Sequence, residues 1–354
     1  MLDLTTGLPM SVEAIDAAWL GAALTSGLGE TVRVDDLRVT HIVWGNATKV
    51  CVEATYGRAP ASLPARLCVK GGFDDRVAEV GSPAQLVLEA EFYGTVRSHL
   101  TARLPRSFYA AGSPSGDQGI VILEDLTTRG VRFVDAGQTL GPDEVASGLE
   151  AQAAWHASTW GSVPGSIPGV RVGGADRRGA RLFFNEKYWA RHFAEEGAPK
   201  LPAGLDDRER VRDGFRALWA YDDAGVHSLQ HGDAHPGNTY VEADGTVVFL
   251  DWAAYFWGHW AYDVALFLTG SLETDDRRRQ EEGLLRHYLD ALATNGGPAL
   301  PFADAWREYG RHQLRGLLWA VSPSVMQPFE RSRPMCDRHA AAVEDHGTLA
   351  LLGV

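Results

Sequence analysis

The chain has 354 residues, of which 45% are hydrophobic and 22% are charged, as in an ordinary folded globular protein. Its 33 Lys and Arg against 46 Asp and Glu give a formal net charge of −13, which disfavours nucleic acid and anionic membranes as partners. The three cysteines show no CxxC spacing, which argues against a disulfide framework or a zinc finger. We therefore expect a cytoplasmic protein, and the length predicts two lobes.

The first third of the chain is predicted to form a small β-rich lobe. A helix is expected over residues 11–25, with Ser11 as its N-cap. Another helix is expected over residues 82–100. Strands are predicted for "VRVDDLRVTHIV", "TKVCVEATY", "ARLCVKG", "RSFYAA" and "IVILEDL". These runs are rich in β-branched residues and are separated by Gly and Pro, which is typical of antiparallel hairpins.

The remainder of the chain is predicted to be mostly helical. Helices are expected over residues 140–160, 182–196, 206–224, 261–270, 275–294, 302–320 and 330–350. A polar run, "HGDAHPGNTYV", and a short strand, "TVVFLDW", interrupt them. The sequence thus predicts an α+β fold with an N-terminal lobe of residues 1–125 and a helical lobe of residues 126–354.

Five residues could serve phosphoryl transfer. Lys70 ends an apolar strand, and Glu89 lies on the following predicted helix. Phosphotransferases of the kinase type use such a lysine on the phosphates and such a glutamate to hold it. In the polar run, Asn238 follows Asp233, and Asp251 ends the next strand. This order can supply a base and two oxygen ligands for one Mg²⁺–phosphate site.

These motifs resemble those of the aminoglycoside phosphotransferase and choline kinase superfamily, and the chain is most similar to its ecdysteroid-kinase-like branch. The late motifs are His231-Gly232-Asp233, Asn238, Leu250-Asp251-Trp252 and the run from Gly258 to Asp263. Upstream, "LEAEFY", "VILEDL" and "AWHASTW" are similar to the helix with the glutamate, the hinge strand and the helix after the hinge. The resemblance spans about residues 40–270 and implies a bilobal protein-kinase-like fold.

The resemblance also implies roles for single residues in an ATP- and Mg²⁺-dependent kinase. Asp233 is the implied catalytic base, and Asn238 and Asp251 are the implied magnesium ligands. Lys70 and Glu89 form the implied pair that holds the phosphates. The supporting residues are His231, which packs under the loop, and Asp263, which accepts hydrogen bonds from the loop backbone.

Further nucleotide contacts are expected from the β-rich lobe. The backbone from Glu124 to Leu126 would hold adenine. In "VWGNATKV", the phosphate-binding loop would comprise Gly45, Asn46, Ala47 and Thr48, although the chain has neither a G-x-G-x-x-G loop nor a Walker A motif. Cys68 should share a face with Lys70, because side chains at i and i+2 of a strand point the same way. It would therefore lie where adenine binds.

Two other functions remain open at this point. A non-catalytic nucleotide-binding protein would use the same fold. A metal-dependent hydrolase would use His231, Asp233 and His235 as ligands, with Asp251 as a fourth. For the kinase, the acceptor is expected to be a small-molecule hydroxyl. The negative net charge permits an aminoglycoside-like antibiotic, whereas the eleven tryptophans, including those just after Asp251, favour a steroid- or terpenoid-like alcohol.

Overall fold

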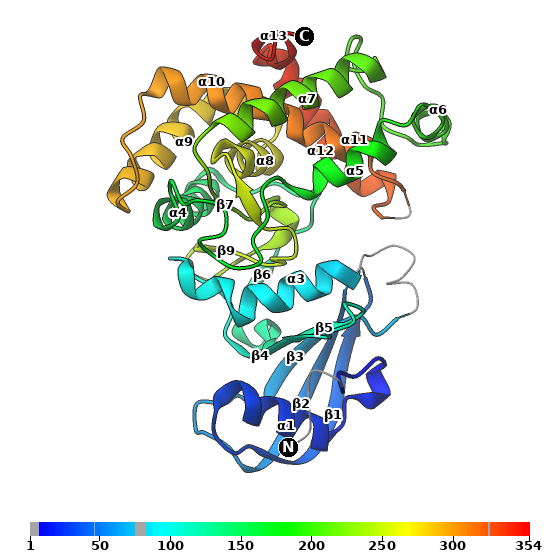
Figure 1. Cartoon of the computed structure of the whole chain (residues 1–354), viewed down its shortest axis with the longest axis vertical. Helices are drawn as coiled ribbons and strands as arrows, with labels where there is room; N and C mark the ends of the chain where they lie inside the picture. Colours follow the sequence, from blue (N-terminus) through cyan, green and yellow to red (C-terminus); the bar gives the residue numbers. More distant parts are fainter. Residues whose placement is uncertain (1–6, 46, 75–82, 325) are drawn as a thin grey trace. The chain divides into compact units, whose positions relative to one another are not determined.

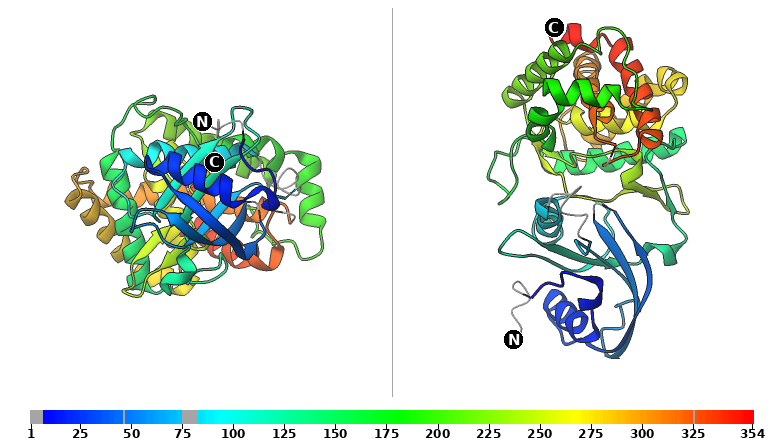
Figure 2. Two further views of the ribbon diagram at one scale, coloured as in Figure 1. Left: turned by 90° about the horizontal axis from the view of Figure 1, so that it is seen from below. Right: turned by 90° about the vertical axis from the view of Figure 1, so that its right-hand side faces the viewer.

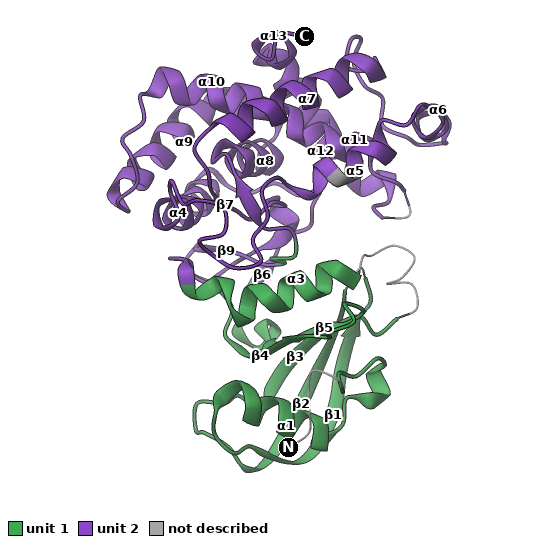
Figure 3. Ribbon diagram, viewed as in Figure 1, with its two compact units in different colours: residues 1–98, 104–131, 251–253 green, residues 99–103, 132–250, 254–354 purple. Residues whose placement is uncertain are grey.

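A computed structural model describes residues 7–45, 47–74, 83–324 and 326–354. The protein has the predicted α+β fold, with a five-stranded antiparallel sheet and many helices. It divides into two compact units (Figure 3). Unit 1 comprises residues 1–98, 104–131 and 251–253, and unit 2 comprises residues 99–103, 132–250 and 254–354. Unit 1 therefore extends beyond the expected boundary at residue 125 and includes three residues from late in the chain.

Unit 1 is built on one twisted sheet, seen from three directions in Figures 1 and 2. Its strands are β1 (Arg33–Val43), β2 (Thr48–Arg58), β3 (Arg66–Gly71), β4 (Ser107–Gly112) and β5 (Gly119–Glu124). They are ordered β1-β2-β3-β5-β4, and all neighbours are antiparallel. The five strands correspond to the five predicted runs, and helix α3 (Pro83–Gly94) lies between β3 and β4 in the chain.

One face of this sheet forms the core of unit 1 with helix α1 (Ala17–Leu28). Leu20 and Leu24 of α1 pack in one cluster with Val50 and Val69 of the strands. The helix begins later than predicted. Its N-cap is Asp16, whose carboxylate accepts a hydrogen bond from the Trp19 amide at 2.7 Å. The predicted cap, Ser11, precedes only a 3-10 turn, Val12–Ala14, because Ile15 leaves the helical conformation before α1 begins. Within the described part of the chain, Ser11 makes no side-chain cap bond.

Unit 2 contains most of the helices. They are α4 (Pro142–Ser158), α5 (Ala175–Phe183), α6 (Glu186–Ala194), α7 (Arg208–Ala224), α8 (Ala261–Ser271), α9 (Thr274–Thr294), α10 (Phe302–His312), α11 (Leu318–Val321), α12 (Phe329–Asp345) and α13 (Thr348–Leu351). Every residue of α8 is buried. The helices α4, α9, α10 and α12 pack around α8 (Figures 1 and 2).

Some predicted helices are divided in the structure. The one expected over residues 182–196 is two helices, because Asn185 caps a new one by accepting from the amides of Lys187 and Tyr188. The one expected over residues 302–320 changes at His312 into the 3-10 segment η5 (Gln313–Leu317). Among the described residues, no helix is both long and apolar enough to cross a membrane.

Short strands in unit 2 frame the polar run of the sequence. β7 (Ser228–Gln230) ends directly before it and pairs with β10 (Phe256–Gly258). The run contains the 3-10 turn η4 (Pro236–Asn238). Its last three residues form β8 (Thr239–Val241), which pairs with β6 (Arg132–Phe133) and β9 (Val247–Phe249). The run is therefore a loop fixed at both ends by strands.

Candidate active site

The loop of unit 2 turns sharply at Gly232. Its φ is +85°, in the region that favours glycine. A Cβ at this position would lie 2.2 Å from the Ala254 carbonyl oxygen. The "HGD" motif therefore requires glycine in the middle for two reasons, backbone conformation and space.

Asp263 and His231 stabilise the loop through hydrogen bonds to its backbone. The Asp263 carboxylate accepts hydrogen bonds from the backbone amides of His231, at 2.5 Å, and Gly232, at 3.0 Å. His231 is fully buried. One of its ring nitrogens is 2.8 Å from the Leu250 carbonyl oxygen, and the other accepts from the Asp233 amide at 3.3 Å. These are the contacts expected for residues that support a loop, which remains their proposed role.

The Asp233 side chain is 44% exposed to solvent. The Asn238 side-chain amide donates to the Asp233 backbone carbonyl at 3.0 Å and to its carboxylate at 3.2 Å. His235 accepts from the Gly237 amide, and its Nε2 lies 3.6 Å from the Asp233 carboxylate. The structure thus brings Asp233 and Asn238 together, as their spacing suggested.

Arg315 also contacts the loop, and no sequence motif predicted it. This buried arginine of η5 donates to the Gly232 carbonyl at 3.3 Å and to the Tyr262 hydroxyl. The Tyr262 hydroxyl donates in turn to Asp176. The available signal was a single cation within the otherwise apolar run "LRGLLW", since an arginine is seldom buried without a partner.

The charges around Asp233 favour its ionised form. Burial by itself would raise the pKa of this carboxyl group, but His235, Arg315 and His231 outweigh burial and hold the pKa below its usual range. Asp233 is therefore a carboxylate at neutral pH. It can accept a hydrogen bond from a substrate hydroxyl.

In unit 1, Lys70 lies between two carboxylates. Its Nζ is 2.6 and 2.7 Å from the Glu89 carboxylate oxygens and 3.2 Å from Asp251 Oδ1. Lys70 is 5% exposed, whereas the Asp251 side chain is 40% exposed. Burial opposes the charged form of Lys70, but Asp251 and Glu89 outweigh it and raise the pKa of this lysine. Lys70 is thus a fixed cation.

Asp251 has an unusual backbone. Its φ is +61°, and among the described residues it is the one non-glycine with a positive φ. Such a conformation costs of the order of 1–3 kcal/mol and is concentrated at functional sites. This strained conformation turns the chain directly after Leu250. The side chain of the same residue, Asp251, contacts Lys70.

A second lysine, Lys49, accompanies Lys70 and was not predicted. The two residues are paired across β2 and β3. Burial and the adjacent Lys70 ammonium lower the pKa of Lys49. The face opposite the core of unit 1 therefore carries two neighbouring lysines, a suitable surface for a polyanion.

The other predicted nucleotide contacts lie in unit 1. Gly45 and Ala47 belong to the β1–β2 connection, Thr48 begins β2, and Asn46 lies outside the described residues. Thr48 Oγ1 is buried and has no hydrogen-bond partner among the described residues. Glu124 ends β5, and Leu126 begins the 3-10 segment η3 (Leu126–Arg129). Cys68 is partly exposed and lies two residues before Lys70 on β3.

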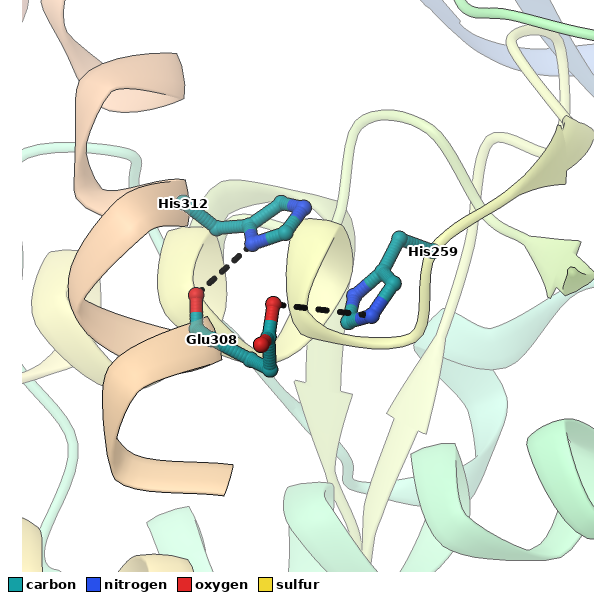
Figure 4. A group of neighbouring side chains, drawn as sticks. All are labelled: His259, Glu308 and His312. Carbon is teal, nitrogen blue, oxygen red and sulfur yellow. Dashed lines mark hydrogen bonds and ion pairs between the residues drawn. The ribbon is translucent and has the colours of Figure 1, made fainter. Parts of the chain in front are cut away.

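The hydrolase reading would need metal ligands in the loop, but both ring nitrogens of His231 contact backbone groups. Within the described ranges, the one group of His, Cys, Asp and Glu close enough to share an ion is His259, Glu308 and His312 (Figure 4). The two imidazoles are stacked, 4.7 Å apart at 16°, so an ion in the plane of one ring lies outside the plane of the other. The His312 nitrogens also contact the Glu308 carbonyl and Asp222. This geometry indicates a structural cluster.

Comparison with known sequences identifies the class. The pattern of the phosphotransferase enzyme family matches residues 70–306, which is more than half of the chain. The chain belongs to this family and is a phosphotransferase, as the sequence predicted. A comparison with curated proteins finds no significant match, and the ecdysteroid-kinase-like branch stays a prediction.

Solved structures show the same fold at low sequence identity. The microcompartment-associated aminopropanol kinase has a TM-score of 0.51 and 13% identity, covering 88% of this chain and 94% of its own. The GDP and kanamycin complex of APH(2")-IIia has a TM-score of 0.51 and 10% identity, covering 92% and 97%. A putative aminoglycoside phosphotransferase from Ralstonia eutropha JMP134 has a TM-score of 0.50 and 14% identity, also covering 92% and 97%.

Proposed function

We propose that this protein transfers the γ-phosphoryl group of ATP, with Mg²⁺, to a hydroxyl group of a small molecule in the cytoplasm. The observation that carries the proposal is the buried Lys70, held by Glu89 and Asp251. A fixed ammonium of this kind suits the phosphate oxygens of a nucleotide. The family match supports the same reaction class.

The proposed magnesium ligands offer suitable donors. Asp251 supplies a partly exposed carboxylate. Asn238 donates through its amide nitrogen to Asp233, which leaves its amide oxygen for another partner. Mg²⁺ prefers oxygen ligands, so these residues fit the ion. A Mg²⁺ ion held by Asn238 and Asp251 would neutralise negative charge on the phosphates.

Asp233 would act on the acceptor. Its carboxylate accepts a hydrogen bond from the substrate hydroxyl and aligns the oxygen with the phosphorus. As the new P–O bond forms and the bond to ADP breaks, the hydroxyl proton moves to an Asp233 carboxylate oxygen. Because the pKa of Asp233 is low, proton transfer is expected late in the reaction, and positioning carries most of the effect.

The acceptor is proposed only as a small-molecule alcohol, of aminoglycoside-like or steroid- and terpenoid-like type. The tryptophans considered for its pocket, Trp252, Trp257 and Trp260, are buried. Trp252 stacks on Phe92 at 4.3 Å. They therefore give no preference for an apolar acceptor.

An ATP-consumption screen tests the proposal. The panel contains sterols, terpenoid alcohols, amino sugars, choline and homoserine, each with wild-type protein and Asp233→Ala. We expect Asp233→Ala to lower turnover by at least about 10²- to 10⁴-fold, the usual contribution of a general base, while ATP binding stays nearly unchanged.

Two outcomes count against this function. Equal ADP release by both proteins with every compound would indicate a non-catalytic nucleotide-binding protein. Failure of ATP to raise the melting temperature in the presence of Mg²⁺ would exclude the nucleotide site itself.

A further inference from the structure

Two of the three cysteines face each other across neighbouring strands of unit 1. Cys51 of β2 and Cys68 of β3 are direct partners in the antiparallel register. The Cα atoms of such partners lie about 4.5 or 5.5 Å apart. Disulfide-bonded cysteines usually have Cα atoms about 4.4–6.8 Å apart, so a bridge needs little backbone movement here.

Both thiols lie on the face of the sheet that carries Lys49 and Lys70. Val50 and Val69 point into the core, and side chains alternate along a strand, so Cys51 and Cys68 point to the opposite face with Lys49 and Lys70. Cys51 is buried and Cys68 is partly exposed. A reagent from solvent can therefore reach the pair through Cys68.

The two thiols affect each other's acidity. Cys68 lowers the pKa of the Cys51 thiol, although burial opposes this shift. Cys51 and burial both raise the pKa of the Cys68 thiol well above its usual range. Cys51 is therefore the more acidic thiol of the pair, and thiolates are the reactive form of cysteine.

We propose that Cys51 and Cys68 form a reversible redox pair that hydrogen peroxide oxidises to a disulfide between β2 and β3. In the first step a sulfur attacks one peroxide oxygen, an S–O bond forms, the O–O bond breaks, and hydroxide takes up a thiol proton as water. In the second step the other sulfur attacks the first, the S–S bond forms, and the S–O bond breaks with release of a second water. The two thiols lose two electrons, and the peroxide gains them.

The disulfide would also act on the nucleotide site, a consequence that rests on the proposed function. The bridge lies two residues from the Lys49–Lys70 pair on both strands. It would draw the sulfurs to a bonding distance of about 2.0 Å and fix Cys68 where adenine is expected. We expect ATP affinity to fall about tenfold, equivalent to about 1.4 kcal/mol.

Peptide mapping tests the bond itself. Wild-type protein and the variants Cys51→Ser, Cys68→Ser and Cys336→Ser are treated with hydrogen peroxide and digested without reductant. Cys336 is the matched control, since it is buried in α12 and burial raises its thiol pKa. A Cys51–Cys68 peptide should appear in wild type and Cys336→Ser, disappear with dithiothreitol, and be absent from the other two variants. Sulfinic acid at Cys68 without a linked peptide, or no oxidation at either cysteine, would overturn the proposal.

Nucleotide titration tests the consequence. Oxidised wild type should bind Mg²⁺–ATP about tenfold more weakly than reduced wild type, and dithiothreitol should restore the affinity. Equal affinity before and after bridging would refute the effect on the site. If the reduced protein binds no nucleotide, the proposed function fails, while the mapping result still decides whether the redox pair exists.

Discussion

Lys70 is buried together with Glu89, and each of the two charges depends on the other. Their side chains are 6% and 3% exposed. Burial raises the pKa of Glu89, and the Lys70 ammonium opposes this shift. Removing one member of such a pair leaves an uncompensated charge in a low-dielectric environment. The pair therefore joins β3 to α3 as well as presenting a cation.

A substitution at Lys70 should therefore affect stability and not only activity. We expect Lys70→Met to lower the free energy of unfolding by about 3–5 kcal/mol, the usual cost of breaking a buried ion pair. Urea denaturation of the whole chain, compared with wild type, measures this loss.

Lys49→Met is the matched control for this experiment. Burial and Lys70 already disfavour the charge of Lys49, so its loss should cost less than about 1 kcal/mol. Equal losses for the two variants would show that the ion pair with Glu89 contributes nothing specific.

The residues of the candidate site differ in how well they could be predicted from the sequence. Roles for Lys70, Glu89, Asp233, Asn238 and Asp251 could be predicted because these residues lie in motifs with fixed spacing, and the roles remain predictions. Arg315 was not found, because its contact with Gly232 joins positions far apart in the sequence. Lys49 was missed because its importance depends on the register of β2 against β3, which an isolated strand pattern does not specify.

At the scale of elements, the loop after β7 requires glycine at position 232, because φ is +85° there and a Cβ would lie 2.2 Å from the Ala254 carbonyl oxygen. Gly245, in the turn between β8 and β9, has almost the same φ, +86°, but has open space where a Cβ would lie. The two glycines therefore separate backbone strain from steric conflict.

Replacing each glycine with alanine tests this distinction. Gly245→Ala should lower the free energy of unfolding by about 1 kcal/mol, the cost of a left-handed conformation. Gly232→Ala adds the conflict with the Ala254 carbonyl, so it should lower stability further, by about 1–3 kcal/mol, and reduce turnover by displacing Asp233. Thermal unfolding and an activity assay of both variants measure these effects, and identical behaviour would rule out the steric argument.

Elements were predicted best where the hydrophobic pattern was strong and local. All five strands of the sheet and the helix α3 were anticipated. Helix boundaries were predicted wrongly where one polar residue caps the helix, as Asp16 caps α1 and Asn185 caps α6. Several similar polar residues lie near each cap in the sequence. Which of them becomes the cap depends on tertiary packing, so helix boundaries are hard to predict from sequence.

At the scale of the molecule, buried histidines link stability to pH. Burial, together with Arg315 and Arg338, lowers the pKa of His339 to about 3. Burial likewise lowers the pKa of His156 and His259. The unfolded chain then binds more protons than the folded one as pH falls below about 6.5. His312 acts in the opposite direction, since Asp222 raises its pKa against the effect of burial.

The net expectation is a protein that loses stability from pH 6.5 to 5. The contribution of His339 should be about 1.4 kcal/mol for each pH unit below 6.5. In His339→Leu this part of the slope should vanish whatever the absolute stability. Urea denaturation at several pH values measures the slopes, and an unaltered slope in His339→Leu would contradict the assignment.

The division into units was the least predictable feature of the molecule. Residues 251–253 belong to unit 1 although the chain around them belongs to unit 2. The contacts responsible include Asp251 with Lys70 and Trp252 with Phe92. The predicted domain boundary was based on sequence patterns. Such patterns do not show that residues 251–253 pack against a unit formed by the first third of the chain.

The contact between Lys70 and Asp251 has a thermodynamic consequence for the proposed kinase. Asp251 Oδ1 lies 3.2 Å from Lys70 Nζ, so a metal ion that binds Asp251 must compete with this internal cation. Phosphates that bind Lys70 would weaken its ion pair with Asp251 and so favour metal binding to Asp251. A metal ion bound to Asp251 would in turn leave Lys70 available to the phosphates. The two ligands should therefore show heterotropic cooperativity, with each raising the affinity of the other by the same factor.

Calorimetric titrations of ATP with and without Mg²⁺, and of Mg²⁺ with and without a nucleotide, measure this factor in both directions. Part of the factor reflects the direct affinity of Mg²⁺ for ATP, so Lys70→Met provides the reference. A smaller factor in Lys70→Met would identify the share that comes from the internal competitor. An unchanged factor would mean that the ion pair plays no part in the cooperativity.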